Sequence, residues 1–92
     1  MVYILFHLST NMVGCDTDDV YAIPEKDALL EDGSLNENYL NEIGYEMARD
    51  YAESYGIEKE SDDEEDPFDF SFERVEGSVS EIESEYGDIL NL

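Results

Sequence analysis

The chain has 92 residues, of which 26 are Asp or Glu and only 4 are Lys or Arg, so its formal charge at pH 7 is -22. A surface of that sign repels nucleic acids and anionic membranes, which excludes direct binding to either. Disorder is disfavoured, because seven Tyr, four Phe and a hydrophobic share of 41% suffice for a small core. We therefore expect residues 1–92 to form one folded domain with a strongly acidic surface.

The cysteine content and the first residues bear on the cellular compartment. Cys15 is the only cysteine, so the chain has no internal disulfide. The apolar segment Val2–Leu8 has no basic region before it and is too short to span a membrane. These features predict a cytoplasmic protein.

The first predicted elements are two strands. Residues Val2–Thr10 are rich in β-branched and aromatic side chains and are apolar at successive positions, which predicts a strand with two apolar faces at the centre of a sheet. Asn and Gly within residues 11–16 favour a turn, and Thr17–Ile23 reads as a returning strand. Together these segments predict a β-hairpin.

Two helices are predicted next. Pro24 favours a short helix over Glu25–Leu30, with Gly33 as a stop. Ser34 and Glu37 resemble a capping box, and apolar residues then recur at helical spacing until Gly56. The pattern predicts a long amphipathic helix over about residues 36–55, packed on the hairpin because an isolated hairpin is only marginally stable.

The last third of the chain begins with an acidic block. Residues 58–66 hold seven acidic side chains and predict a mobile connection. Phe68, Phe70 and Phe72 then alternate with polar residues, which predicts a third strand near residues 68–75. A second capping box at Ser80 and Glu83 predicts a short C-terminal helix. The expected fold is α+β, with a three-stranded antiparallel sheet packed against the long helix.

Acidic side chains form a row on the outward face of the predicted long helix. The row contains Glu42, Glu46, Asp50 and Glu53, interrupted only by Arg49. Neighbours three or four residues apart on a helix lie about 5–6 Å from each other, close to the ~6–7 Å between successive phosphates of duplex DNA. A solvated face is the simple explanation, but carboxylates recur in nearly every segment. We therefore expect a partner-binding surface made of this row and the consecutive carboxylates Asp62, Asp63, Glu64, Glu65 and Asp66.

Other chemistries fit the residues less well. Asp16, Asp18 and Asp19 lack the spacing of an EF-hand loop, and the block at 62–66 has no Gly around which ligands would fold. One His and one Cys, His7 and Cys15, fall short of a zinc ligand set. The chain contains no Gly-rich phosphate loop and no nucleophile elbow. We therefore predict no metal site, no cofactor and no enzymatic activity.

The combination of STNMVGCD after the first strand, EMARDYAESYG in the long helix and the tract SDDEED resembles the small acidic phage-encoded proteins that imitate DNA. These include anti-restriction proteins, acidic anti-CRISPR proteins and inhibitors of uracil-DNA glycosylase. Members of this class differ in fold, so the resemblance implies a mode of action and assigns no individual residues.

The function expected from this resemblance is inhibition of a DNA-binding protein. The carboxylates would occupy the basic channel of a nuclease, CRISPR effector, glycosylase or nucleoid protein in the host cytoplasm, if the chain is phage-encoded. One alternative is a small adaptor that binds a basic partner without competing with DNA, and another is a cation-binding protein. A homodimer is a further option, because an edge strand bearing Phe residues can pair with its own copy.

Overall fold

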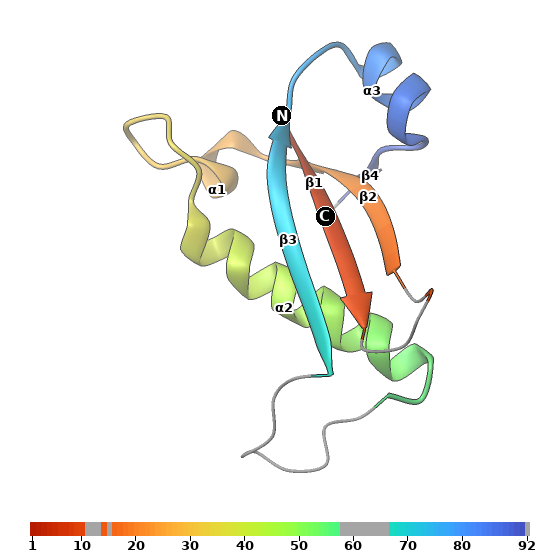
Figure 1. Ribbon diagram of the computed structural model, residues 1–92. Coiled ribbons are helices and arrows are strands. Elements are labelled where there is room, and N and C mark those ends of the chain that lie inside the picture. Colours follow the sequence, from red (N-terminus) through yellow and green to blue (C-terminus); the bar gives the residue numbers. More distant parts are fainter. Residues whose placement is uncertain (11–13, 15, 58–66, 92) are drawn as a thin grey trace.

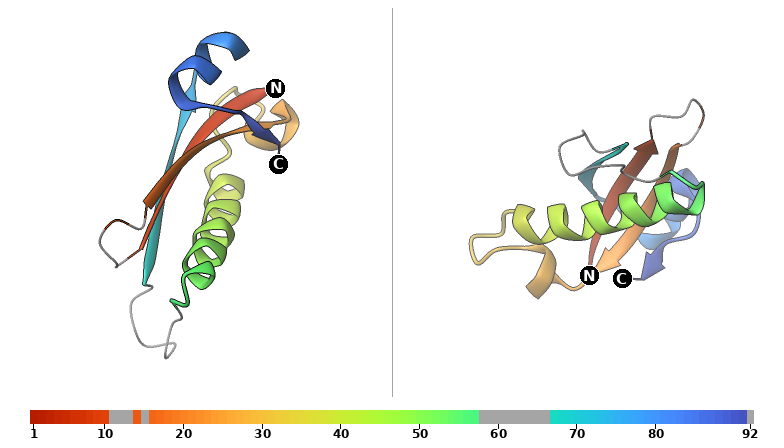
Figure 2. Two further views of the ribbon diagram at one scale, coloured as in Figure 1. Left: turned by 90° about the vertical axis from the view of Figure 1, so that its right-hand side faces the viewer. Right: turned by 90° about the horizontal axis from the view of Figure 1, so that it is seen from below.

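The computed structural model describes residues 1–10, 14, 16–57 and 67–91. It has an α+β fold in which one face of a sheet packs on a long helix, while a short helix covers one end of the other face (Figures 1 and 2). In chain order the elements are β1 (Val2–Thr10), β2 (Asp16–Ile23), α1 (Glu25–Ala28), α2 (Glu37–Ser54), β3 (Phe68–Val75), α3 (Val79–Tyr86) and β4 (Leu90–Asn91).

The predicted hairpin and third strand are confirmed. Strand β1 pairs antiparallel with β2, from Val2 opposite Ile23 to Ser9 opposite Asp16, and antiparallel with β3 on its other side. The strand order β3-β1-β2-β4 therefore places β1 inside the sheet, as its apolar sequence predicts. Its two faces are unequal, however, because alternate residues from Val2 to Leu8 are buried while those from Tyr3 to Ser9 are only partly buried.

The prediction of a purely antiparallel three-stranded sheet was wrong. The sheet has four strands and is mixed, because β4 pairs in parallel with β2 through Tyr21 opposite Leu90 and Ala22 opposite Asn91. Two residues are too short to produce a recognisable strand pattern, since strand signals need about four to eight residues. Leu90, an apolar residue beyond the last helix, belongs to this strand.

The long helix α2 is confirmed, but its predicted cap is not the one that forms. The side chain of Asn36 accepts a hydrogen bond from the backbone N–H of Tyr39 and so caps the helix. Ser34 lies before the cap, where its backbone oxygen accepts from Leu30 and its hydroxyl donates to Asp32. At the other end Gly56 adopts a positive φ of 76°, as expected for a helix stop.

The core lies between α2 and one face of the sheet. Its buried apolar side chains come from β1, the end of β2, α1 and α2, and they are Val2, Ile4, Phe6, Leu8, Ile23, Ala28, Leu40 and Ala48. Gly44 permits the close approach of helix and sheet, because a Cβ at this position would lie 2.6 Å from Cδ2 of Phe70. The apolar stripe predicted for the helix therefore packs on the sheet as expected.

The two short helices differ from their predicted bounds. Helix α1 ends at Ala28, because Leu29 leaves the helix to form a β-bridge with Leu35. Helix α3 confirms the predicted C-terminal helix, but Ser78 caps it by accepting from the N–H of Glu81, two residues before the predicted cap at Ser80. Gly87 ends α3 with a φ of 92°.

Helix α3 lies on the sheet face opposite α2 (Figure 2), where it contributes to a second, smaller group of buried apolar residues. It contacts β2, and its Ile82 is 2% exposed. Val20 and Ala22 face the same side as the partly buried residues of β1 and are themselves buried. The rest of this face, which carries Leu5, His7 and Ser9 of β1 and which we call the open face, is not covered by any helix among the described residues.

Candidate acidic interaction surfaces

The predicted acidic row on α2 lies on the solvent side of the helix. Leu40, Gly44, Ala48 and Ala52 are the buried positions of α2 and fix the side that faces the sheet. Glu42, Glu46, Asp50 and Glu53 are all exposed. Helical spacing thus brings these four carboxylates together along one face, as the sequence predicts.

The row is barely neutralised by its one cation. Nη2 of Arg49 lies 3.8 Å from Oδ1 of Asp50, and the two side chains are 49% and 71% exposed. An ion pair between such exposed neighbours contributes little, because water screens the attraction. The predicted second part of the surface, Asp62, Asp63, Glu64, Glu65 and Asp66, and the predicted mobile connection at 58–66 lie outside the described residues.

The structure brings together a second set of carboxylates that the sequence reasoning did not combine. Strand residues directly opposite each other share a face of the sheet, and those opposite Ser9 are Asp16 on β2 and Asp69 on β3. In the same way Asp18 lies opposite His7, and Glu73 opposite Leu5. The open face therefore carries four exposed carboxylates: Asp16, Asp18, Asp69 and Glu73.

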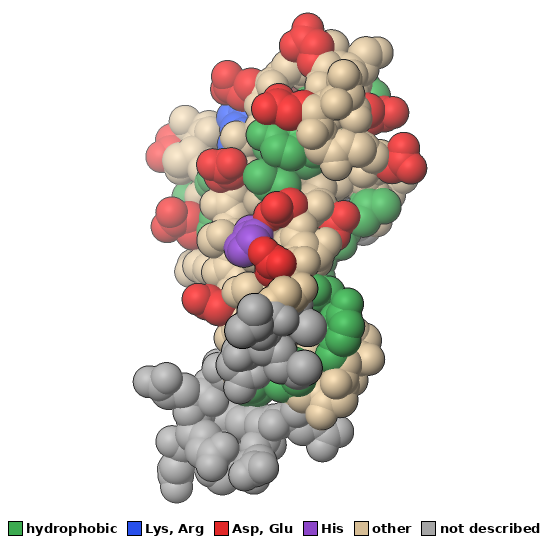
Figure 3. Space-filling view, turned by 45° about the vertical axis from the view of Figure 1, so that its right-hand side comes forward, with side chains coloured by type: hydrophobic (Ala, Val, Ile, Leu, Met, Phe, Trp, Pro, Cys, Tyr) green, Lys and Arg blue, Asp and Glu red, His purple; other side chains and the backbone are tan. Residues whose placement is uncertain are grey.

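This second set was detectable only in part from the sequence. The alternation of Asp16 with Asp18, and of Asp69 with Glu73 around Ser71, indicates that each pair projects from one face of its strand. The register with β1 decides that the two pairs share a face. Figure 3 shows acidic side chains next to the single histidine of the chain.

His7 lies on the open face among these carboxylates. Its Nδ1 is hydrogen-bonded to Oδ1 of Asp18, the residue directly across from it on β2, and the two side chains are 40% and 60% exposed. These residues line a shallow depression together with Leu5, Ser71 and Glu73. The lining of the depression therefore includes the apolar side chain of Leu5 and the acidic side chains of Asp18 and Glu73.

Asp19 lies on the other side of the sheet from Asp16 and Asp18. It is opposite Phe6, faces α2 and is partly buried, and its Oδ2 accepts a hydrogen bond of 3.3 Å from Oγ1 of Thr17. Burial raises the pKa of the neighbouring Tyr21 hydroxyl above its usual value, and the negative charge of Asp19 raises this pKa further. The charge of Asp19 thus lies at the edge of the core, beside Tyr21, and does not belong to the open face.

Asp32 precedes the helix α2 in the connection from α1. Its Oδ1 accepts hydrogen bonds from the hydroxyl of Ser34 at 2.6 Å and from the backbone N–H of Ser34 at 3.0 Å. These hydrogen bonds favour the charged form and lower the pKa of Asp32 below its usual value. The carboxylate thus stays ionised to lower pH than a free one.

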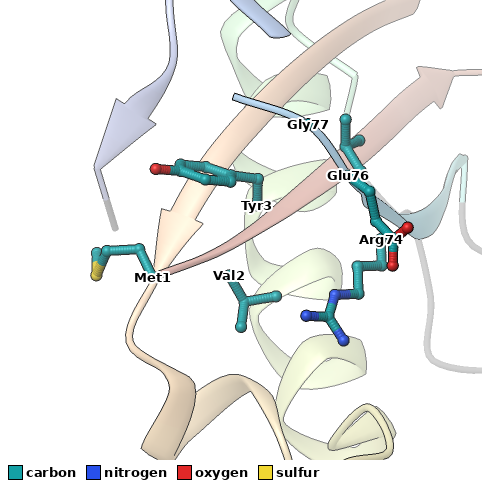
Figure 4. A pocket seen from close by; sticks show the side chains of 7 residues that line it. Met1, Val2, Tyr3, Arg74, Glu76 and Gly77 are labelled. Carbon is teal, nitrogen blue, oxygen red and sulfur yellow. The ribbon is translucent and has the colours of Figure 1, made fainter. Parts of the chain in front are cut away.

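Cations are few and scattered over the described residues. Arg74 lies in a pocket beside Met1, Val2 and Tyr3, at the end of the sheet where β1 begins. In Figure 4 its side chain extends on the same side of the sheet as Val2, whereas Tyr3 points the other way. Arg74 therefore faces the side of α2 and leaves the open face negative.

A metal-binding cluster and a membrane-spanning helix are both absent from the described residues. Among them, no three His, Cys, Asp or Glu side chains converge so as to hold a metal ion. No described helix has the length and apolar character needed to cross a bilayer. Comparisons with protein-family models, curated proteins and solved structures give no match to this chain.

Proposed function

We propose that this protein is a DNA mimic, an inhibitor that occupies the basic DNA-binding surface of another protein. The target would be a nuclease, CRISPR effector, glycosylase or nucleoid protein in the cytoplasm, which is the host cytoplasm if the chain is phage-encoded. The inhibitor itself would catalyse no reaction and need no cofactor. Its carboxylates would take the places of DNA phosphates and exclude DNA from the target.

The observation that carries the proposal is the distribution of charge over the fold. Every described Asp and Glu is exposed except Asp19 and Asp27, which are partly buried. The ion pairs within the described residues are confined to the contacts of His7 with Asp18 and of Arg49 with Asp50. Most of the described carboxylates on the row of α2 and on the open face are thus turned outward and take part in no ion pair.

The spacing of these carboxylates also supports the proposal. Alternate residues of a strand project from one face about 6.5–7 Å apart, as Asp16 and Asp18 do on β2. Neighbours in the α2 row lie about 5–6 Å apart. Both spacings are comparable to the ~6–7 Å between successive phosphates of a DNA strand. A groove built to bind phosphates can therefore contact several of these side chains at once.

Net repulsion is a further argument for a binding role. A formal charge of -22 destabilises the compact state and exceeds what solubility demands. A complementary basic surface would relieve that repulsion on binding. Such complementarity also accelerates association and makes it steeply dependent on ionic strength.

The decisive experiment is capture of a partner followed by DNA competition. The protein is immobilised, incubated with bacterial lysate and washed at low and high salt. A retained DNA-binding protein that is released both by salt and by duplex DNA supports mimicry. A partner that binds this protein and DNA simultaneously contradicts mimicry and favours the adaptor.

Charge-reversal variants then locate the contact. Glu42→Lys, Glu46→Lys and Asp50→Lys together should lower the affinity for the captured partner by at least about tenfold, since buried or close charge pairs contribute several-fold each. The matched control is Glu81→Lys, Glu83→Lys and Glu85→Lys on α3, which changes the net charge equally. Equal losses in both variants would mean that only the overall charge matters and not the α2 row.

A further inference from the structure

Strand β3 forms one edge of the sheet. It pairs with β1 along its whole length, from Phe68 opposite Thr10 to Val75 opposite Tyr3. No other described strand pairs with its outer side. Backbone N–H and C=O groups on such an edge can pair with a further strand. One N–H group of β3, that of Phe70, already donates a hydrogen bond of 2.8 Å to Oδ1 of Asp69. With eight residues, β3 is long enough to accept one.

The two faces of this edge have opposite character. Asp69, Ser71 and Glu73 point to the open face and are exposed. Phe68, Phe70 and Phe72 point towards α2 and are only partly buried, although they pack against the core. The edge therefore offers acidic side chains above the plane of the sheet and aromatic ones below it.

Helix α2 extends the aromatic side of the edge. Tyr45 is 39% exposed, and its ring packs edge-on against Phe68 with 5.3 Å between the ring centroids. Phe72 contacts Phe6 in the core at 5.9 Å between centroids. The aromatic layer thus runs from the core to the rim of the sheet, where it remains accessible to an added side chain.

We propose that the free edge of β3 binds an extended segment of the basic partner by β-strand addition. In such a segment Lys or Arg alternates with apolar residues. The basic side chains meet Asp69 and Glu73, and the apolar ones extend the layer of Phe68, Phe72 and Tyr45. The inference rests on the proposed function for the basic nature of the partner, and it adds the contact surface and the conformation of the bound segment.

Charge argues against a second copy of this chain as the occupant. If two β3 strands pair antiparallel about Ser71 with both α2 helices on the same side, Asp69 of each copy lies opposite Glu73 of the other. Like charges directly opposite each other destabilise strand pairing. Each copy also carries a formal charge of -22, so the whole molecules repel.

The test uses a synthetic peptide as long as β3 in which Lys and Val alternate. The control peptide has the same composition with all Lys residues preceding all Val residues, so its charge is identical. We expect the alternating peptide to bind at least about tenfold more tightly, because only it can present Lys and Val to opposite faces. Amide exchange in β3 should slow when it binds. Equal affinities, or protection elsewhere than β3, would overturn the proposal.

Substitutions on the strand provide the second arm. Asp69→Lys with Glu73→Lys should lower the affinity for the alternating peptide by about tenfold or more, whereas Glu83→Lys with Glu85→Lys on α3 should lower it only about twofold. Circular dichroism verifies folding, and Asp69→Asn with Glu73→Gln serves as the milder variant. If the β3 and the α3 variants lower the affinity equally, the peptide responds only to the net charge of the protein and not to the β3 edge.

The same variants separate this inference from the proposed function. If the captured partner is displaced by DNA but binds the β3 variant as tightly as the original protein, mimicry stands and the β3 site is wrong. If the alternating peptide protects β3 while every captured partner binds DNA simultaneously, the β3 site stands and mimicry is wrong. Gel filtration tests whether a second copy of the chain binds the edge. A dimer of the original protein that is absent from the β3 variants would show that this edge mediates self-association.

Discussion

The two faces of the sheet differ although the same central strand supplies both. On the side of α2, Val2, Ile4, Phe6 and Leu8 are at most 5% exposed. On the open face, Tyr3, Leu5, His7 and Ser9 alternate with them and stay partly exposed, because α3 reaches only one end of that face. The comparison indicates that one face provides most of the stability. The other face is thereby left to carry carboxylates that a core could not accept.

The largest effect should come from substituting adjacent residues on the two sides of β1. Phe6→Ala should destabilise the fold by about 3–5 kcal/mol, because it empties a fully buried site. Leu5→Ala should cost only about 1 kcal/mol, because the side chain is already partly in water. Urea unfolding followed by circular dichroism measures both. If Phe6→Ala does not fold, Phe6→Leu should still cost more than Leu5→Ala; the reverse order would contradict the comparison.

The apolar cluster under α3 should contribute less than the main core. Ile82→Ala should cost ~2 kcal/mol, at the lower end of the range for buried Ile, because α3 can detach while the sheet remains folded. Val79→Ala, at a position that is 45% exposed, is the control and should change stability by less than ~0.5 kcal/mol. Amide exchange in α3 should accelerate in the Ile82 variant while that of β1 stays slow. Loss of protection in both elements would mean that the two faces fold as one unit.

The closeness of α2 to the sheet is tested by Gly44→Ala. The added methyl would meet the ring of Phe70, and overpacking of this kind costs roughly 1–3 kcal/mol. The higher helix propensity of Ala offsets up to ~1 kcal/mol, so we expect a net loss of about 1–2 kcal/mol in thermal or urea unfolding. The same substitution in a Phe70→Leu background should cost less, since the smaller side chain can move. If Gly44→Ala costs the same in the Phe70→Leu background, the added methyl group does not clash with the side chain at position 70.

The smallest effect concerns the pH dependence at Tyr21, on the side of α2. Because its pKa is raised in the folded state, the folded protein retains this proton when the unfolded chain has lost it. Stability should therefore fall as the pH rises above about 10, the usual value for tyrosine, and continue to fall until the folded pKa is passed. Asp19→Asn should lower the pKa of Tyr21 only partly, because burial is the larger cause. NMR titration of the Tyr21 ring measures this, and a full return to the usual value would assign the shift to Asp19 alone.

The accuracy of the sequence-based predictions depended on the length of each pattern. β1, β2, α2 and β3 each have eight or more residues, and each was predicted within a residue or so of its ends. The caps were misplaced because Ser34 and Ser80 fit the same rule as Asn36 and Ser78, which actually cap the helices. The parallel strand β4 was missed because two residues carry no period. The conformation of such a short element depends on the strand with which it pairs and not on its own residues.

The sequence by itself determined the acidic character of the protein, the long helix and the outward row on that helix, because helical spacing is a local property. Only the tertiary structure decided that Asp16, Asp18, Asp69 and Glu73 share one face, that Asp19 lies on the other, and that β3 is an edge. Pairing between strands distant in the sequence fixes these relations, since a shift of one residue would turn each side chain to the opposite face. No single strand contains that information.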